Sequence, residues 1–131
     1  MDIQRAIREA GVVGAGGAGF PTHVKLDAQV DYVLANGAEC EPLLHKDAEL
    51  TENYVDQVIR GMEISREATG AKQLIFGIKA KRKKTVAILE GAIRKKEIKL
   101  HLFGDYYPAG DEFVLVYLTT LTNHMDLSLN I

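Results

Sequence analysis

The chain has 131 residues, of which 47% are hydrophobic, so it is long and apolar enough to bury one core. Its 16 Lys and Arg side chains nearly balance 18 Asp and Glu, and the net charge of −2 disfavours bulk binding to polyanions. The single cysteine excludes an internal disulfide, and no stretch reaches the roughly 20 apolar residues of a membrane helix. Because the N-terminus also lacks a signal-peptide layout, we expect one cytoplasmic domain spanning residues 1–131.

The N-terminal segment predicts a short helix followed by a shaped loop. Apolar residues recur three or four positions apart at Ile3, Ala6, Ile7 and Ala10. This spacing predicts an amphipathic helix over residues 3–10, which Gly11 ends. Five of the nine residues 11–19 are glycine and Pro21 follows, so we expect no regular structure from there until about Val30.

The middle of the chain predicts a buried strand and then a long helix. Residues 31–35 are short, apolar and β-prone, and Asn36–Gly37 is expected to end that strand. Asp47 is expected to cap the helix and Gly70 to end it. The apolar face of this helix consists of Leu50, Tyr54, Val55, Val58, Ile59 and Met62.

The C-terminal half continues the alternation of strands and helices. Residues 73–78 predict a second buried strand, and residues 98–102 alternate as expected of a strand near a sheet edge. The core face of the helix between them is Val86, Leu89, Ala92 and Ile93. After a turn at residues 104–108, residues 111–118 favour a helix, with a strand as the alternative, and residues 119–131 have no clean period.

This order of elements predicts an α/β, three-layer fold. A mostly parallel sheet would be flanked by helices and preceded by a short helix and a glycine-rich loop.

Residues 14–19 contain the pattern G-x-G-x-x-G, in which bare backbone lets N–H groups approach a phosphate or a flat ring. A Rossmann fingerprint requires a strand before these glycines and a helix after them, whereas here a helix precedes and Phe20–Pro21–Thr22 follows. The Rossmann interpretation is therefore rejected. A flexible linker is the alternative on composition alone, although the preceding helix and the Phe–Pro stop argue against it.

A second cluster, residues 36–42, places an amide and two carboxylates just past the end of a buried strand. As an ordinary polar turn, it would cap the following helix. As a ligand site, Asn36 would hydrogen-bond a ring or sugar, and Glu39 and Glu41 would accept from hydroxyl or amide donors. Cys40 favours a packing role over a nucleophilic one, because no histidine accompanies it in sequence. The scattered histidines also lack metal-ligand spacing, so no metal is expected.

Five cations lie within residues 79–84: Lys79, Lys81, Arg82, Lys83 and Lys84. No aromatic residue is interleaved with them and the whole chain is acidic, so a solvated helix surface is favoured over a nucleic-acid patch. A docking face for an acidic protein lies between these two interpretations. We expect no nucleic-acid partner.

Taken together, Gly-Ala-Gly-Gly-Ala-Gly-Phe-Pro-Thr-x-x-Lys (residues 14–25), Asn-Gly-Ala-Glu-Cys-Glu-Pro (residues 36–42) and Asp47 resemble the flavin-binding domain of the NADH-dehydrogenase 51 kDa subunit family. The cysteine between the glutamates makes the chain most similar to the C subunit of the Rnf electron transport complex and to the proline-reductase-associated electron transfer protein. The resemblance extends over about residues 11–118.

The resemblance implies that the chain binds FMN, which takes a hydride from NADH and passes electrons singly to iron-sulfur centres. The residue types in the two motifs can provide the stacking, hydrogen bonds and positive charge that FMN and NADH require. By position, the implied flavin contacts are Gly14, Gly16 and Gly17 along the flavin, Lys25 as a positive charge, and Asn36 and Glu39 on the ring or the ribityl chain.

By the same resemblance, Phe20 and Glu41 would face the nicotinamide nucleotide. Gly110-Asp111-Glu112 occupies the place of the family's Gly-Glu-Glu or Gly-Ala-Glu motif, so Glu112 and Asp111 would close the pocket. No catalytic side chain is implied, because the cofactor carries the hydride chemistry. The implied partners are NADH and other electron-transfer subunits, including those of a membrane-bound complex, which would place the chain peripherally on the inner face of the membrane.

Three departures from the family open an alternative. Ala38 replaces an acid found in the complex I branch, residues 119–131 do not resemble the family's Asn-Asn segment, and a cysteine cluster for iron-sulfur binding is missing. We therefore expect a piece of a larger subunit or the product of a truncated gene, with the clusters in the remainder or in partner subunits. The alternative is a non-catalytic α/β fragment or docking module that does not bind flavin tightly. An apolar edge left uncovered would favour self-association into a homo-oligomer.

Overall fold

The computed structural model describes residues 2–15, 18–41, 43–120 and 128–130, with Thr120 and residues 128–130 described by their backbone. Four described strands form one parallel sheet in the order β3-β2-β1-β4. These strands are β1 (Tyr32–Gly37), β2 (Gln73–Lys79), β3 (Ile98–Phe103) and β4 (Ser128–Asn130).

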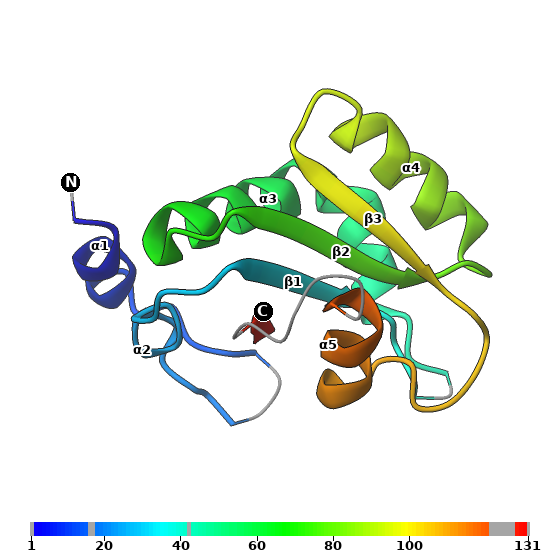
Figure 1. Cartoon of the computed structure of the whole chain (residues 1–131), viewed down its shortest axis with the longest axis horizontal. Helices are drawn as coiled ribbons and strands as arrows, with labels where there is room; N and C mark the ends of the chain where they lie inside the picture. The colour runs from blue at the N-terminus through cyan, green and yellow to red at the C-terminus, as the bar shows by residue number, and fades with distance from the viewer. Residues whose placement is uncertain (1, 16–17, 42, 121–127, 131) are drawn as a thin grey trace.

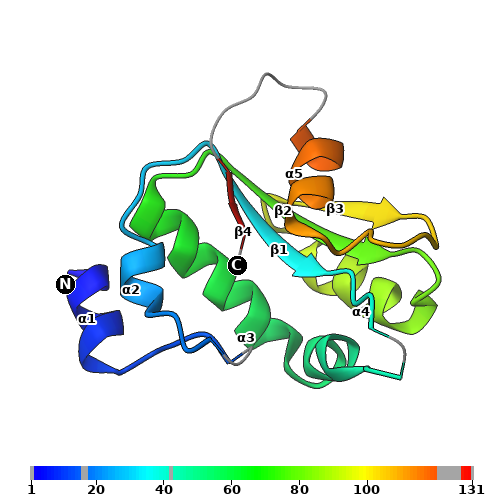
Figure 2. The same cartoon turned by 90° about the horizontal axis from the view of Figure 1, so that it is seen from below.

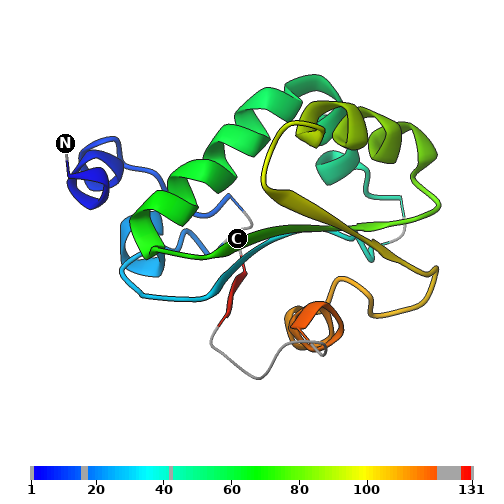
Figure 3. The same cartoon turned by 45° about the horizontal axis from the view of Figure 1, so that its top comes forward.

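Helices cover both faces of the sheet. Those described are α1 (Ile3–Glu9), α2 (Thr22–Lys25), α3 (Lys46–Thr69), α4 (Lys83–Ile93) and α5 (Glu112–Thr120). Helices α3 and α4 lie on one face and α5 lies on the other, whereas α1 and α2 lie at one end (Figure 1). Figure 3 shows the three layers from a second direction. The predicted three-layer α/β fold with a parallel sheet is confirmed.

The strand alternation divides the core into two clusters. Val33 of β1 points toward α3 and α4 and packs with Met62 and Leu89, and the next residue, Leu34, joins a cluster on the α5 face. Phe103 and Leu115 belong to that second cluster, and both are buried. The first half of β1 is therefore packed on both faces of the sheet.

The N-terminal region is more regular than its glycines predict. Asp2 caps α1 by accepting from the backbone N–H groups of Gln4 and Arg5, and Gly11 follows with φ +65°. The expectation of no regular structure before Val30 was wrong, because the short helix α2 begins at Thr22 with Pro21 as its N-cap. Pro is compatible with a helix start, since it loses no helical hydrogen bond there.

The end of β1 also differs from its prediction. Asn36 and Gly37 pair in register with Gly77 and Ile78 of β2, so they extend the strand rather than ending it. An added Cβ on Gly37 would lie 2.6 Å from the ring of Phe76. Glycine here therefore makes room for an aromatic ring rather than forming a turn.

Helix α3 corrects three expectations. Its N-cap is His45, so Asp47 lies in the first turn instead of capping the helix. Leu50 and Tyr54, which were expected on the core face, are 52% and 53% exposed. The reason is a kink at Tyr54, with φ −134° and ψ 35°, which changes the face that the first turns present. The expected end at Gly70 is confirmed, with φ +69° in the left-handed region.

The C-terminal part confirms two expectations and adds a strand. Among the described strands β3 pairs only with β2, as expected of an edge, and residues 112–120 form a helix. Residues 128–130, where no period was found, pair in parallel with β1, whereas residues 121–127 and 131 of that tail lie outside the described residues. None of the described helices has the length and apolar character needed to cross a membrane.

Substituting Gly77→Ala tests the tight packing beneath α5. The added Cβ would lie 2.6 Å from the ring of Phe103 and 3.1 Å from Leu115, so the core must shift. We expect urea unfolding to show a loss of about 1–3 kcal/mol in the free energy of unfolding. Gly91→Ala on α4 is the matched control, because its Cβ meets nothing within 4 Å, and it should gain up to about 1 kcal/mol. Equal stabilities would contradict the packing argument.

Candidate functional site

The side chain of Asn36 joins two distant parts of the chain at the end of β1. Its Nδ2 donates to the carbonyl oxygen of Gly110 at 2.8 Å, and its Oδ1 accepts from the N–H of Ala38 at 3.1 Å. Asn36 therefore already holds the loop after β1 against the segment that leads into α5. One amide hydrogen and one lone pair remain for a ligand.

Cys40 and Gly110 complete this junction. The N–H of Gly110 donates to Sγ of Cys40 at 2.9 Å, and the thiol donates to the carbonyl oxygen of Ala38 at 3.3 Å. A Cβ on Gly110 would lie 2.1 Å from that carbonyl oxygen, so only glycine allows this approach. Cys40 therefore has the packing role that the sequence favoured, and its hydrogen bonds were not foreseen.

Glu39 is the buried carboxylate of the site. Its side chain is only 6% exposed, and Oε1 accepts a long bond of 3.5 Å from the N–H of Asp47 at the start of α3. Its Oε2 is fully buried and has no hydrogen-bond partner among the described residues. The nearest cationic group that pairs with it is Nη2 of Arg82, at 4.0 Å. An acceptor with no donor in such a place is costly unless a ligand supplies one.

The charge on Glu39 affects its neighbour Asp47. Burial raises the pKa of the Asp47 carboxyl, the negative charge of Glu39 raises it further, and the ammonium of Lys46 opposes both. The negative charge of Glu39 therefore acts on Asp47 in the first turn of α3. Sequence reasoning missed this effect, because it treated Asp47 only as a helix cap.

In the motif at residues 110–112, the Asp111 side chain is hydrogen-bonded within the fold, whereas the Glu112 side chain is exposed. Oδ1 of Asp111 accepts from the N–H groups of Phe113 at 3.0 Å and Val114 at 3.1 Å, so this carboxylate caps α5. Glu112 is exposed, as is Glu41 on the loop after β1. Asp111 is thus already engaged in the fold, and the two glutamates are open to solvent.

The glycine-rich loop is described at residues 11–15 and 18–19, and it lies between α1 and α2. Val13 and Pro21 form an antiparallel bridge, and the N–H of Gly14 donates to the carbonyl oxygen of Phe20 at 2.9 Å. Phe20 is 54% exposed, and Lys25 is exposed in the last turn of α2. In Figure 1 the described part of this loop and α5 both lie below β1, the loop beside α2, and Figure 2 shows the two well apart. Gly16 and Gly17 lie outside the described residues.

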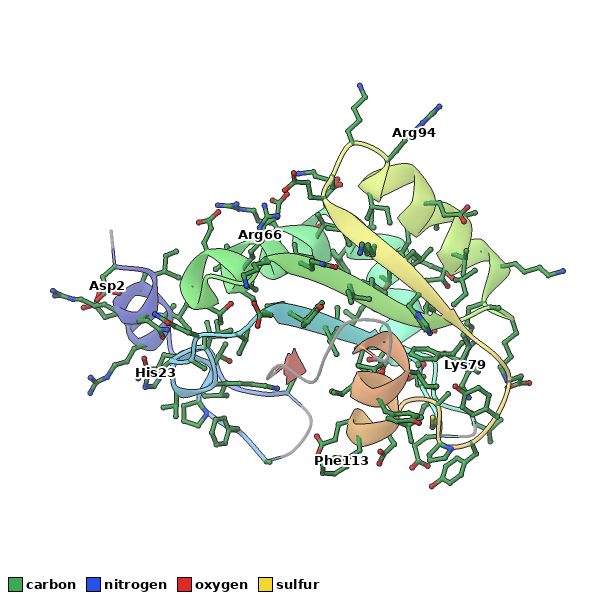
Figure 4. The ribbon with its side chains drawn as sticks, in the orientation of Figure 1. Asp2, His23, Arg66, Lys79, Arg94 and Phe113 are labelled. Atoms are coloured by element: carbon green, nitrogen blue, oxygen red, sulfur yellow. The ribbon has the colours of Figure 1, made fainter. Side chains whose placement is uncertain are left out.

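The basic run after β2 is largely paired with acidic side chains. Lys81 lies 2.7 Å from Asp105, and Lys84 lies 2.5 Å from Glu52. Lys79, at the end of β2, is buried and lies 3.9 Å from Asp105 (Figure 4). The run is therefore not a uniform cationic surface. Lys79 also differs from the expected solvated helix surface, because it ends the buried strand β2.

Removing the Asn36 amide tests its structural role in the ligand-free chain. Asn36→Ala leaves the carbonyl of Gly110 and the N–H of Ala38 unpaired, so we expect a loss of about 1–3 kcal/mol in the free energy of unfolding. The matched control is Asn53→Ala, since this exposed amide bonds only within α3, and it should stay within about 0.5 kcal/mol of the parent. Urea titration measures both. Indistinguishable variants would mean that the junction does not stabilise the fold.

The pKa of Asp47 predicts a pH effect on stability. Because the folded state raises this pKa above its ordinary 3.8, folding favours the protonated form, and its contribution to stability falls as the pH rises through that interval. Asp47→Asn should therefore gain stability at pH 7, by less than about 1 kcal/mol for a partly exposed group, and should lose this advantage near pH 3. Asp56→Asn, an exposed change of equal charge on α3, should show no such pH dependence. Parallel pH profiles of thermal unfolding would contradict this account.

The comparisons with known proteins agree with the motifs. Residues 7–127 match the model of the Nuo51 FMN-binding domain. Cobalamin reductase PduS of Citrobacter freundii is 46% identical over 118 residues, covering 90% of this chain and 26% of that protein. The C subunit of the Na(+)-translocating ferredoxin:NAD(+) oxidoreductase complex of Acetobacterium woodii is 34% identical over 123 residues, covering 90% of this chain and 28% of that protein.

Solved structures give the same result. An NAD+-reducing [NiFe]-hydrogenase in the H2-reduced state matches with a TM-score of 0.76 and 26% identity, covering 88% of this chain and 23% of that chain. The chain thus spans about a quarter of the length of these relatives. The residues matched by the family model include both the glycine-rich loop and the loop after β1. The chain therefore belongs to the family of the Nuo51 FMN-binding domain, and its relatives include Rnf-type C subunits and PduS.

Proposed function

We propose that this chain binds FMN beside the C-terminal end of β1 and accepts hydride from NADH for passage to iron-sulfur partners. The observation that carries the proposal is Oε2 of Glu39, a buried acceptor with no donor among the described residues. Ligands of parallel sheets bind beyond the C-terminal ends of the strands, which is where this atom lies. A ring N–H or a ribityl hydroxyl of FMN would satisfy it.

The surrounding residues fit such a cofactor. Asn36 keeps one amide hydrogen and one lone pair free, and Gly110 allows close approach of the backbone at the same place. Asp111 would act through its cap, which fixes the start of α5 and thereby the position of Glu112. When bound, FMN supplies the hydride acceptor and the ability to release electrons singly.

The glycine-rich loop would provide the other side of the site. Gly14, Gly16 and Gly17 would allow close backbone approach to the flavin, and Lys25 would supply a positive charge that favours the anionic reduced ring. These roles rest on the family resemblance, because no contact between the described residues of this loop and Glu39 supports them. Substitution of Lys25 tests the contribution of this side.

The nicotinamide nucleotide would lie against exposed groups. Phe20 offers an aromatic face for stacking, and Glu41 and Glu112 are open to solvent. Carboxylates beside a dinucleotide are best placed on ribose hydroxyls or the carboxamide, because a negative charge repels the pyrophosphate. Both glutamates would therefore recognise donors of NADH.

The partners would be other electron-transfer subunits. Relatives include subunits of an ion-translocating oxidoreductase complex and of an NAD+-reducing hydrogenase, which supports assembly into a larger redox protein. We further propose a cytoplasmic location, peripheral on the inner membrane face through such partners, and no nucleic-acid ligand. Iron-sulfur clusters would belong to partner subunits or to further chain, and homo-oligomer formation stays a prediction.

One observation favours the second candidate, an α/β module that does not bind flavin tightly by itself. Asn36 and Asp111 carry structural hydrogen bonds within this chain, so part of the proposed ligand set is already engaged. A complete site would then need groups supplied by a partner subunit or by further chain. Direct titration separates the two candidates.

FMN binding is measured by quenching of flavin fluorescence. We expect the parent chain to bind at micromolar FMN, and Glu39→Gln to bind at least about tenfold more weakly, since a hydrogen bond to a charged group is worth about 1.5–3 kcal/mol. Lys25→Gln should also weaken binding. Anaerobic addition of NADH to the loaded parent should then bleach the flavin absorbance.

Glu49→Gln is the control for Glu39, because Glu49 is exposed in the same helical turn as Asp47. It should bind FMN within about twofold of the parent. Binding that is weaker than about millimolar in the parent would sink the proposal that this chain alone is a flavoprotein and would favour the second candidate.

A further inference from the structure

We propose that Arg82 is a positioning residue that holds Glu39 ready for the flavin. The inference rests on the proposed function, but it concerns a residue that lies on neither of the two sequence motifs. Arg82 precedes α4, more than 40 positions after Glu39 in the chain. Its guanidinium reaches the loop between β1 and α3, where Glu39 lies.

The backbone of Arg82 is fixed at the start of α4. Its N–H donates to the carbonyl oxygen of Lys79 at 3.0 Å, and its own carbonyl accepts from the N–H of Val86 at 2.9 Å. The side chain therefore extends from a rigid point, the junction of β2 and α4. An anchored stem reduces the conformational entropy that the guanidinium loses when it is oriented.

The guanidinium clamps the loop after β1. Nη2 donates to Nδ1 of His45 at 3.0 Å and lies 3.5 Å from the carbonyl oxygen of Leu44. His45 is the N-cap of α3, whose second residue, Asp47, donates its backbone N–H to Glu39. Arg82 thus holds the end of this loop that joins α3, and from there its guanidinium lies near Glu39.

The distance between the two charged groups gives Arg82 its specific role. Nη2 lies 4.0 Å from Oε2 of Glu39, which is too long for a hydrogen bond but close enough for electrostatic attraction, and the Glu39 side chain is only 6% exposed. A direct bidentate pair would occupy both carboxylate oxygens. At this distance Arg82 compensates the buried charge and leaves Oε2 free to accept a hydrogen bond from the ligand.

Neighbouring cations do not duplicate this role. Lys81 and Lys84 pair with Asp105 and Glu52 respectively, and Lys83 is exposed. Among the described residues, Arg82 is the one cation in an ion pair with Glu39. Lys83 therefore provides a matched control, since Lys83→Gln removes the same charge from the adjacent position.

The test is a double-mutant cycle on FMN affinity. Arg82→Gln should weaken binding at least about tenfold, Arg82→Lys should recover part of the loss, and Lys83→Gln should stay within about twofold of the parent. If Arg82 acts through Glu39, the double variant Arg82→Gln/Glu39→Gln should bind no more weakly than Glu39→Gln alone. Additive losses, or a loss from Lys83→Gln equal to that from Arg82→Gln, would overturn the proposal.

A flavin-free measurement separates this proposal from the proposed function. In the ligand-free chain, the carbon-13 NMR signal of the Glu39 carboxyl should move in Arg82→Gln and stay in place in Lys83→Gln. If the parent fails to bind FMN, the proposed function falls, and this signal alone decides whether Arg82 holds Glu39. An unmoved Glu39 signal in Arg82→Gln would overturn the positioning role whether or not FMN binds.

Discussion

The close approach of Gly110 to the loop after β1 is the constraint on which the site depends. A single Cβ at Gly110 would collide with the carbonyl of Ala38, yet this contact lets Asn36 bond across 74 positions of sequence. Cys40 closes the same junction through its thiol. Since α5 begins immediately afterwards, the junction also fixes where that helix packs on the sheet. The residues nearest the proposed ligand are therefore already hydrogen-bonded to one another without it, an arrangement that lowers the entropy lost on binding.

Periodicity was sufficient to predict the layers of this fold. Strand-like runs at β1, β2 and β3 alternate with helical runs, and parallel pairing follows from that order. Local exceptions were not predictable in the same way. Tyr54 carries apolar character at a helical spacing, but the kink at its own backbone exposes it. The pairing of residues 128–130 with β1 depends on a long-range contact and not on any pattern within that segment.

For the site, too, the sequence predicted the general location but not the contacts made in the folded chain. The polar cluster in the sequence placed Asn36 and Glu39 near the end of β1, where the structure has Asn36 within the strand and Glu39 just after it. Sequence could not show that Asn36 and Asp111 use their side chains within the fold, because those bonds are set by geometry. Arg82 carried no signal at all, since within its basic run it is indistinguishable from the lysines beside it. Only the folded chain separates the cation that reaches Glu39 from those that pair elsewhere.

An acidic loop that is to receive an anionic cofactor requires compensation. Glu39, Glu41 and Asp47 bring negative charge to the segment after β1. The pKa of Asp47 is raised by burial and then by the charge of Glu39. Two groups oppose this negative charge: the N-terminus of α3, whose N–H at Asp47 reaches Glu39, and the guanidinium of Arg82. Both act on Glu39, the carboxylate that cannot reach solvent. Glu41 is exposed, so water screens its charge. The fold places its fixed positive groups beside Glu39, whose side chain is only 6% exposed and is therefore screened less by solvent.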